Sequence, residues 1–449
     1  MSTEQRVAQA VREAIDAVPV RPGPAVGVLR TRAAARTRSR PAATGSRSRW
    51  SGPLFAAAGV AAVVVAAGML VPAGAIYGAI HRMPASAAHG AVLPTEVTGP
   101  SLFTSTVSEA PPGPAVAIYR QDRELDALWG ASQFVVLGAD GRTLRRLDLA
   151  EDRAHIAADS GWYAADSLLA PDGAAVAVAD ALEARASIDL VDLRTGDVRE
   201  FALSPPAAVD LLAWAPDGRS LVFTEFRRSG TLPQSAVATL AVLDLTSGAV
   251  RRFAGHSVRD AYGAWGASVS PDGRSMVVAD PNGRRPLQIV DLRTGEVRRS
   301  LPHTQPQRLV NRAGWSPDGR FVVVQEGDGP RERLTFLPVT ADREVPAPVL
   351  MPQGEVVAWT SPDTLLMRGG ERNALWEVRL DGSPARAVIT LSRTTYDVQL
   401  AADLATDLRV VAVDGPRHGP LPWPWRAGIG ILAGLVAAVV VLVLHRRAG

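Results

Sequence analysis

The sequence predicts an all-β propeller flanked by two transmembrane helices, with a short amphipathic helix at the N-terminus. Three observations support this: a turn motif repeated about every 45 residues, a hairpin motif between its copies, and two long uncharged segments outside the repeats. The expected organisation is a cytoplasmic Arg-rich segment 1–50, a transmembrane helix 53–80, a linker 81–114, a propeller 115–414, a joint 415–425 and a transmembrane helix 426–445.

The turn motif reads Trp-Ser-Pro-Asp-Gly-Arg in its clearest copy, residues 315–320. Proline presets φ for a turn, the Asp side chain can bond the backbone ahead of it, and Gly takes the left-handed position without steric cost. Apolar and β-branched residues on both sides predict strand, tight turn, strand, which makes this Asp a turn residue. Spacings of 45, 55, 46 and 45 residues separate the five motif prolines, which are Pro171, Pro216, Pro271, Pro317 and Pro362.

The second motif reads Val-Asp-Leu-Arg-Thr-Gly at residues 191–196 and returns at 290–295, with a variant at 242–248. Its partly alternating pattern breaks at Thr-Gly or Ser-Gly, which is typical of a hairpin in which Gly supplies a positive φ. Two hairpins in each period give four strands, and four strands make one propeller blade.

The two motifs together resemble the TolB-type and WD-like β-propeller repeats of bacteria, over roughly residues 125–413. This resemblance implies the fold and little about function, because such propellers host many unrelated activities. The first and last units depart from the pattern because they lack Pro-Asp-Gly, and the copy at Pro362 has lost its Gly.

The number of blades depends on how the ends of the propeller are counted. A strand at 115–119 and a half unit at 398–413 remain outside six hairpin units, which are 130–150, 168–200, 211–253, 266–300, 313–346 and 356–388. Joining that strand to the half unit closes the ring and removes exposed sheet edges. This count predicts seven blades. The alternative is six blades, with the two end pieces sharing the first blade.

The amino-acid composition limits the possible kinds of site and indicates the source genome. The chain has no cysteine, which excludes disulfides and thiolate metal sites. All 48 basic residues are Arg, which together with the Ala and Val richness indicates a high-GC, actinobacterial genome. Ten Arg fall in residues 1–50, where a capping box at Ser2 and helical spacing predict a helix over 3–18. No aromatic residue is interleaved there before Trp50, so we expect a membrane-surface segment and no nucleic-acid partner.

Two segments are long enough to cross a bilayer. Residues 53–80 carry no charge, and as a helix could reach ~42 Å against a hydrocarbon core of ~30 Å. A cleaved signal peptide, with a site near Ala87, is the alternative, but the apolar stretch is longer than such a peptide needs. Residues 427–444 are apolar, follow Trp423 and Trp425, and precede basic residues. Arg at both outer ends predicts cytoplasmic termini, a cell-membrane location and an extracellular propeller.

The sequence contains few residues in the patterns that catalysis or metal binding requires. The seven His are scattered without ligand spacing, and the sequence offers no catalytic, metal-binding or cofactor-binding residue that we would assign; the ligand-binding residues stay unassigned. We expect Trp214, Trp315 and Trp359 to pack between blades. The longest insertion, 225–237, is the candidate recognition loop, with Phe226-Arg227-Arg228 expected on the surface.

These observations predict a non-enzymatic, membrane-anchored extracytoplasmic propeller whose partners are the lipid bilayer and a protein or envelope ligand. One alternative is a transmembrane signalling regulator whose N-terminal helix docks a cytoplasmic protein. In layout this is similar to membrane anti-sigma proteins, although the sequence lacks a His/Cys zinc motif. Another alternative is a propeller hydrolase or lyase that uses channel carboxylates and a metal.

Overall fold

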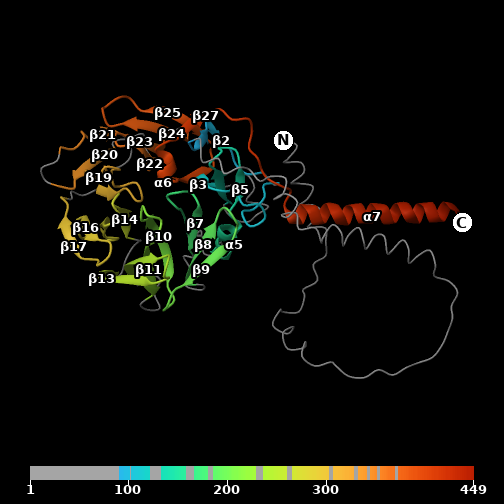
Figure 1. Ribbon diagram of the computed structural model, residues 1–449, viewed down its shortest axis with the longest axis horizontal. Coiled ribbons are helices and arrows are strands. Elements are labelled where there is room, and N and C mark those ends of the chain that lie inside the picture. Colours follow the sequence, from blue (N-terminus) through green and yellow to red (C-terminus); the bar gives the residue numbers. More distant parts are fainter. Residues whose placement is uncertain are drawn as a thin grey trace, which may run out of the picture. The chain divides into compact units, whose positions relative to one another are not determined.

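Six sheets, five of them with four strands and one with five, stand in a ring around a central axis in the computed structural model (Figure 1). The structure describes residues 90–101, 103–121, 133–157, 166–179, 186–228, 236–259, 265–302, 307–327, 332–340, 344–350, 354–369 and 373–448. The predicted N-terminal helix at 3–18, the Arg-rich segment and the predicted span at 53–80 lie outside the described residues.

Blades 2 to 5 each run in chain order from an inner strand to an outer one, with antiparallel pairing throughout. Blade 2 consists of β6 (Asp166–Leu169), β7 (Ala175–Ala179), β8 (Ser187–Asp192) and β9 (Val198–Ala202). Blade 3 consists of β10 (Ala208–Trp214), β11 (Ser220–Arg228), β12 (Ala236–Asp244) and β13 (Val250–Arg259). Blade 4 consists of β14 (Gly266–Val269), β15 (Ser275–Ala279), β16 (Gln288–Asp291) and β17 (Val297–Ser300). Blade 5 consists of β18 (Gln307–Leu309), β19 (Phe321–Glu326), β20 (Arg333–Pro338) and β21 (Val349–Leu350).

Blade 1 combines the two ends of the propeller. Its order is β26 (Thr395–Leu400), β3 (Ala115–Gln121), β4 (Gln133–Gly138) and β5 (Leu144–Arg146). The innermost strand therefore comes from the C-terminal side and pairs antiparallel with β3, with Gln399 opposite Ile118. The ring therefore has six blades, so the prediction of seven is wrong and its alternative, in which the end pieces share the first blade, is confirmed.

The predicted seventh blade does not form, because the half unit expected at 398–413 is not a hairpin. After β26 the chain forms a short helix, α6 (Ala402–Ala405), and then β27 (Arg409–Val411). β27 pairs in parallel with β1 (Val92–Pro94), and β2 (Glu96–Val97) pairs in parallel with β25 in blade 6. The part of the expected tether 81–114 that the structure describes is therefore bound to the propeller rather than extended from it. The other strands of blade 6 are β22 (Gly354–Ser361), β23 (Thr364–Gly369), β24 (Ala374–Arg379) and β25 (Arg386–Leu391).

The turn chemistry predicted from the motifs is confirmed. In each of the four complete Pro-Asp-Gly copies, Asp accepts a hydrogen bond from the backbone N–H two residues ahead. The Gly that follows has φ between 66° and 72° at all four positions. At Gly173 a side chain is also excluded by space, because a Cβ there would meet the Ala115 carbonyl oxygen at 2.1 Å. This turn holds blade 2 against β3, since the Ala115 N–H donates to the Gly173 carbonyl at 2.8 Å.

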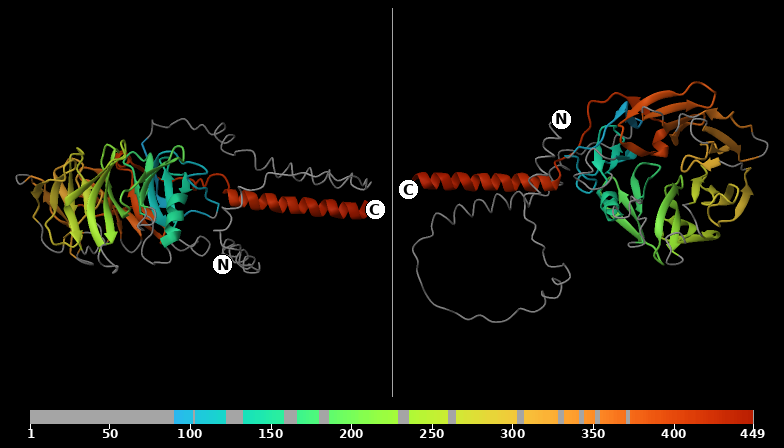
Figure 2. Two further views of the ribbon diagram at one scale, coloured as in Figure 1. Left: turned by 90° about the horizontal axis from the view of Figure 1, so that it is seen from below. Right: turned by 180° about the vertical axis from the view of Figure 1, so that it is seen from behind.

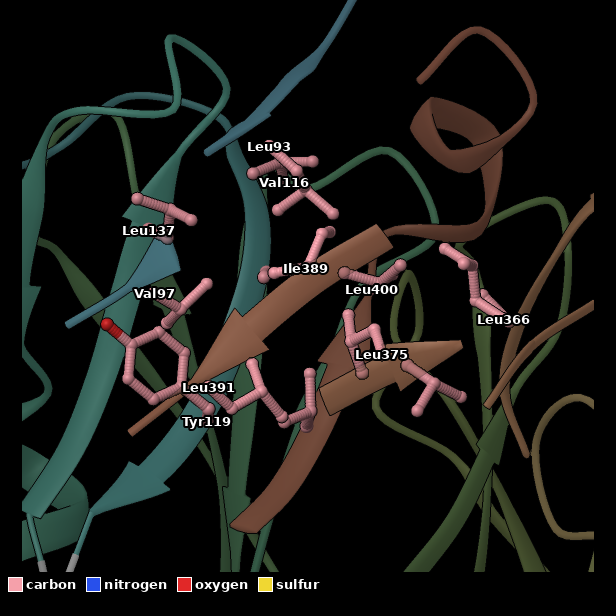
Figure 3. Packing of buried hydrophobic residues seen from close by; sticks show 14 of the residues in the cluster. Leu93, Val97, Val116, Tyr119, Leu137, Leu366, Leu375, Ile389, Leu391 and Leu400 are labelled. Atoms are coloured by element: carbon pink, nitrogen blue, oxygen red, sulfur yellow. The ribbon is translucent and has the colours of Figure 1, made fainter. Parts of the chain in front are cut away.

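The hydrophobic core is divided among the blade interfaces. Each of six buried clusters joins two neighbouring blades, and the clusters follow one another around the whole ring. Figure 3 shows the cluster where blades 6 and 1 meet, with Leu375 and Ile389 facing Val116 and Tyr119. Because both faces of each sheet are covered, middle strands such as β4 are buried at every residue, whereas outermost strands such as β17 are mostly exposed.

The connection from blade 1 to blade 2 contains a helix. β5 ends at Arg146, and α5 (Asp148–Ala157) follows, with two acidic residues in its first turn, where the helix dipole favours negative charge. Arg153 of this helix makes a buried ion pair with Asp189 of β8. The helix therefore ties the two blades together on their outer side (Figure 2).

The C-terminal helix α7 (Trp423–Ala448) differs from the propeller in composition. Over Trp423–Arg446 the mean hydropathy reaches 2.8, and none of this stretch is buried within the protein. The helix is long enough and apolar enough to cross a membrane. It is the one such helix in the part of the chain that the structure describes.

Candidate functional site

The inner strands of the six blades enclose a channel of about 1220 Å³. One level of this channel carries charged residues at a common position of the repeat. Three carboxylates, one guanidinium and one glycine line the channel there, and the Asp166 carboxyl interacts with the carboxyl of Asp210: the lining members are Asp210, Glu355, Asp397, Arg312 and Gly266. We call this set, together with Asp166, the charged ring.

Sequence reasoning missed the charged ring because its members are not evenly spaced from the motif prolines. Asp166 and Arg312 lie five residues before their proline, Asp210 lies six before and Glu355 seven before. The strand pairing accounts for the differences, since β10 contains one register shift and β22 contains two. Each bulge inserts one extra residue, so the same level of the channel falls at different distances in sequence.

Asp166 and Asp210 interact with each other from neighbouring inner strands, β6 and β10. Both are half-buried, and a side-chain hydrogen bond joins their carboxyl groups. Burial raises the pKa of Asp166 well above its ordinary value, and repulsion from Asp210 raises this pKa further. Burial also raises the pKa of Asp210. Because two adjacent carboxylates resist double ionisation, the pair retains a proton at pH values where an exposed Asp has lost it.

Arg312 supplies the one positive charge of the ring. Its Nη1 lies 3.5 Å from Oδ1 of Asp397, and its backbone has a φ of 62°, in the left-handed region. Burial also raises the pKa of Glu355, another member of the charged ring. Arg368 opposes this effect, because its Nε donates a hydrogen bond to the Glu355 carboxylate at 3.0 Å. Arg312 lies beside Asp397 and Arg368 beside Glu355, so the negative charge that remains belongs to the Asp166–Asp210 pair, which is suited to accept hydrogen bonds from a cationic group.

Asp166→Asn should stabilise the protein at neutral pH. A carboxyl whose pKa rises on folding holds its proton more tightly in the folded state than in the unfolded state. The free energy of unfolding therefore falls as the pH rises above the ordinary pKa of the carboxyl. Asn removes that cost and keeps an acceptor for the Leu211 N–H, which lies 2.5 Å from Oδ2 of Asp166. We expect the free energy of unfolding to increase by about 0.5–2 kcal/mol, the usual gain from a single stabilising substitution.

Thermal unfolding at several pH values between acid and neutral checks this result. The advantage of the variant should shrink as pH falls towards the ordinary pKa of Asp. Asp197→Asn, at an exposed turn position, is the matched control and should show little change. A variant that is less stable than the wild type at every pH would mean that the Asp166 carboxyl is structural.

The tryptophans singled out in the sequence pack between blades, as expected. Trp214 donates from Nε1 to the Leu168 carbonyl of blade 2 at 3.1 Å, and Trp359 donates to the Ala313 carbonyl of blade 5 at 2.8 Å. Trp315 is buried among residues of blades 4 and 5. All three also line the channel, so they form its wall.

The insertion expected to be a surface recognition loop is mostly a longer hairpin. Phe226 and Arg227 belong to β11, where Phe226 packs on the core between blades 3 and 4. Arg227 pairs with Glu225, which is fully buried and also accepts two hydrogen bonds from Arg252. The expectation that Phe226 is exposed is wrong, because two longer strands absorb the extra residues of the repeat.

The metal-dependent alternative finds no cluster to support it in the described part of the chain. Within those ranges, no group of three or more His, Cys, Asp or Glu residues is arranged to hold a metal ion.

No protein-family model matches the sequence, and no curated protein matches it either. Similar solved structures include TolB from Acinetobacter baumannii, with 16% identity, 64% of this chain and 67% of that chain covered, and a TM-score of 0.43. They also include oligogalacturonate lyase from Vibrio parahaemolyticus, with 12% identity, 65% and 78% covered, and a TM-score of 0.43. At such identities the likeness concerns the fold alone, and the fold assignment rests on the strand pairing described above.

Proposed function

We propose that this chain is a non-enzymatic, membrane-anchored propeller that works outside the cytoplasm as an interaction module. The observation that carries the proposal is α7. Residues 427–444 have no charged side chain and extend ~27 Å as a helix, close to the ~30 Å hydrocarbon core. Exposure of such an apolar helix surface to water costs free energy, whereas contact with lipid does not.

The proposed topology has two spans and cytoplasmic termini. Ten Arg precede the uncharged segment 53–80, and Arg446 and Arg447 end α7, so positive charge lies at both outer ends. Cytoplasmic flanks of membrane helices are enriched in Arg and Lys. Two spans with cytoplasmic ends place the propeller between them on the other side of the membrane.

Single-cysteine labelling tests the topology cleanly, because the chain contains no cysteine. Leu350→Cys places a thiol on the most exposed large apolar residue among the described residues of the propeller, where 74% of the residue surface is accessible. A membrane-impermeant maleimide added to spheroplasts should label Leu350→Cys. It should label Ala448→Cys only after the membrane is opened. Labelling of Ala448→Cys in intact spheroplasts, or protection of Leu350→Cys, contradicts the proposed orientation.

A truncation tests the number of spans. A chain that ends after Gly419 lacks α7 but keeps residues 53–80. Two spans predict that it still sediments with membranes after an alkaline wash, and a chain that also lacks residues 1–80 should be released. Release of the first truncation would mean that α7 is the sole anchor.

The proposed contact with a ligand is the charged ring in the channel. An oligo-arginine peptide is a suitable probe, since it presents guanidinium groups to the carboxylates. Asp210→Asn should weaken its binding several-fold, whereas Arg312→Gln should strengthen it, and added salt should reduce both effects. Asp197→Asn, at an exposed turn, is the control for general surface charge. Equal effects of Asp197→Asn and Asp210→Asn would place binding outside the channel.

A further inference from the structure

The outer edge of blade 1 carries an additional layer made by the segments on either side of the propeller. We call this layer, residues 103–110 and 414–426, the collar. The Arg146 N–H donates to the Ser105 carbonyl at 3.0 Å, and the Leu144 N–H donates to the Arg417 carbonyl at 3.0 Å. The Ser105 N–H donates to the His418 carbonyl at 2.9 Å, so the two collar segments also bind each other.

Side chains lock the collar at the residue where α7 begins. The Glu109 carboxylate accepts a hydrogen bond from the Trp423 N–H at 2.9 Å, which caps the first turn of the helix. Thr104 Oγ1 lies 2.7 Å from Nδ1 of His418. Gly419 has a φ of 82°, and a Cβ there would meet the Arg145 guanidinium carbon at 2.8 Å. The collar is therefore a bonded connection between blade 1 and the start of α7.

The collar gathers exposed aromatic surface. Phe103 is 46% exposed and Trp423 is 64% exposed, and no other Phe or Trp in the described ranges is among the exposed large apolar residues. The Phe103 ring stands edge-on to Trp425, with centroids 5.3 Å apart. These three aromatic residues come from both sides of the propeller in sequence, and they meet immediately before the uncharged part of α7.

We propose that the collar is a bilayer-docking surface that holds the edge of blade 1 at the lipid head groups. This inference rests on the proposed membrane anchoring. Trp rings favour the membrane–water interface, because one end is apolar and the other can hydrogen-bond. Phe103 extends the aromatic surface from α7 onto the propeller itself, and Arg417 and Arg426, two exposed residues of the same collar, suit lipid phosphates. The apolar stretch of α7 that follows fixes lipid as the occupant.

Docking through the collar would fix the orientation of the propeller relative to the membrane. A propeller joined only by a flexible tether would present all sides to the bilayer equally. A collar that is bonded to β5 and seated in the head groups instead keeps blade 1 at the membrane. Blade 4, on the opposite side of the ring, is then directed away from the membrane (Figure 1).

Quenching of a site-specific fluorophore tests the inference with the full chain. Pro416→Cys places a label on an exposed collar residue and leaves all three aromatic side chains in place. The protein is reconstituted in vesicles of equal parts phosphatidylcholine and phosphatidylglycerol that carry a nitroxide on some head groups. The collar label should lose most of its fluorescence, whereas a label at Leu350→Cys in blade 5 should lose little.

The aromatic contribution is tested in the same background. Changing Phe103 and Trp423 together to Ser should restore much of the fluorescence of the Pro416→Cys label, and circular dichroism should show an unchanged propeller. Equal quenching of the two labels, or no effect of the double change, overturns the inference. Retention after an alkaline wash is measured in parallel. Loss from the vesicles contradicts the anchoring proposal, whereas retention without collar quenching contradicts docking alone.

Discussion

Replacing Trp265 by alanine should lower the free energy of unfolding by about 3–5 kcal/mol, the usual cost of emptying a buried aromatic site. Trp265 is 1% exposed and lies between blades 3 and 4. Its Nε1 donates to the Ala238 carbonyl at 3.3 Å, and its backbone N–H donates to Thr224 Oγ1 at 3.1 Å. His256 packs edge-on against the ring, with centroids 5.4 Å apart. The smaller side chain leaves a cavity that these neighbours cannot fill.

Thermal unfolding of the detergent-purified protein, followed by circular dichroism, measures this loss. Trp423→Ala is the matched control, because the same side chain is removed from an exposed position. The control should stay within about 0.5 kcal/mol of the wild type. Similar losses for the two variants would show that the interface between blades 3 and 4 is not a stabilising core.

Gln399→Leu should cost about 2–4 kcal/mol, because it removes the hydrogen bonds that join blade 1 to blade 2 at the ring closure. Gln399 lies on β26 and is 4% exposed. Its Oε1 accepts from the Leu169 N–H at 3.1 Å, and its Nε2 donates to the Ser167 carbonyl at 2.8 Å. Leucine has a similar volume but leaves both backbone groups of β6 without this partner.

Hydrogen exchange locates the effect of this change. Amides of β26 and β3 should exchange faster in Gln399→Leu, while those of blade 4 should change little, because the weakened interface is local. Gln288→Leu, at a half-buried position of β16, controls for the gain of an apolar side chain. Faster exchange throughout the ring would show that closure and the rest of the propeller unfold as one unit.

Local chemistry made the blades predictable. The Pro-Asp-Gly turns repeat because each needs a preset φ, a side-chain acceptor and a left-handed residue, and those needs are written in adjacent positions. Gly218 and Gly273 have the positive φ that this requires. Interblade packing of Trp214 and Trp359 was also predictable, because a large ring beside a buried turn has few other places to lie.

Long-range pairing could not be predicted in the same way. The pairing of β26 with β3 joins distant segments, and the sequence offered only the argument that an open edge must be closed. Strands as short as β1 and β2 show no period, so the sequence of residues 92–97 predicts a linker, whereas Leu93 and Val97 are buried in the structure. The charged ring was hidden for another reason, since bulges in β10 and β22 shift its members relative to the turn motif.

The position of β26 has a consequence for how this protein is made. A nascent chain that has emerged only as far as blade 6 cannot complete blade 1, because the innermost strand, Thr395–Leu400, is still missing. Until then β3 presents unpaired backbone groups to other chains, which is a risk for aggregation. A chaperone that shields this edge would therefore have its greatest effect before Thr395–Leu400 has been synthesised, and a premature stop before Thr395 should yield insoluble product.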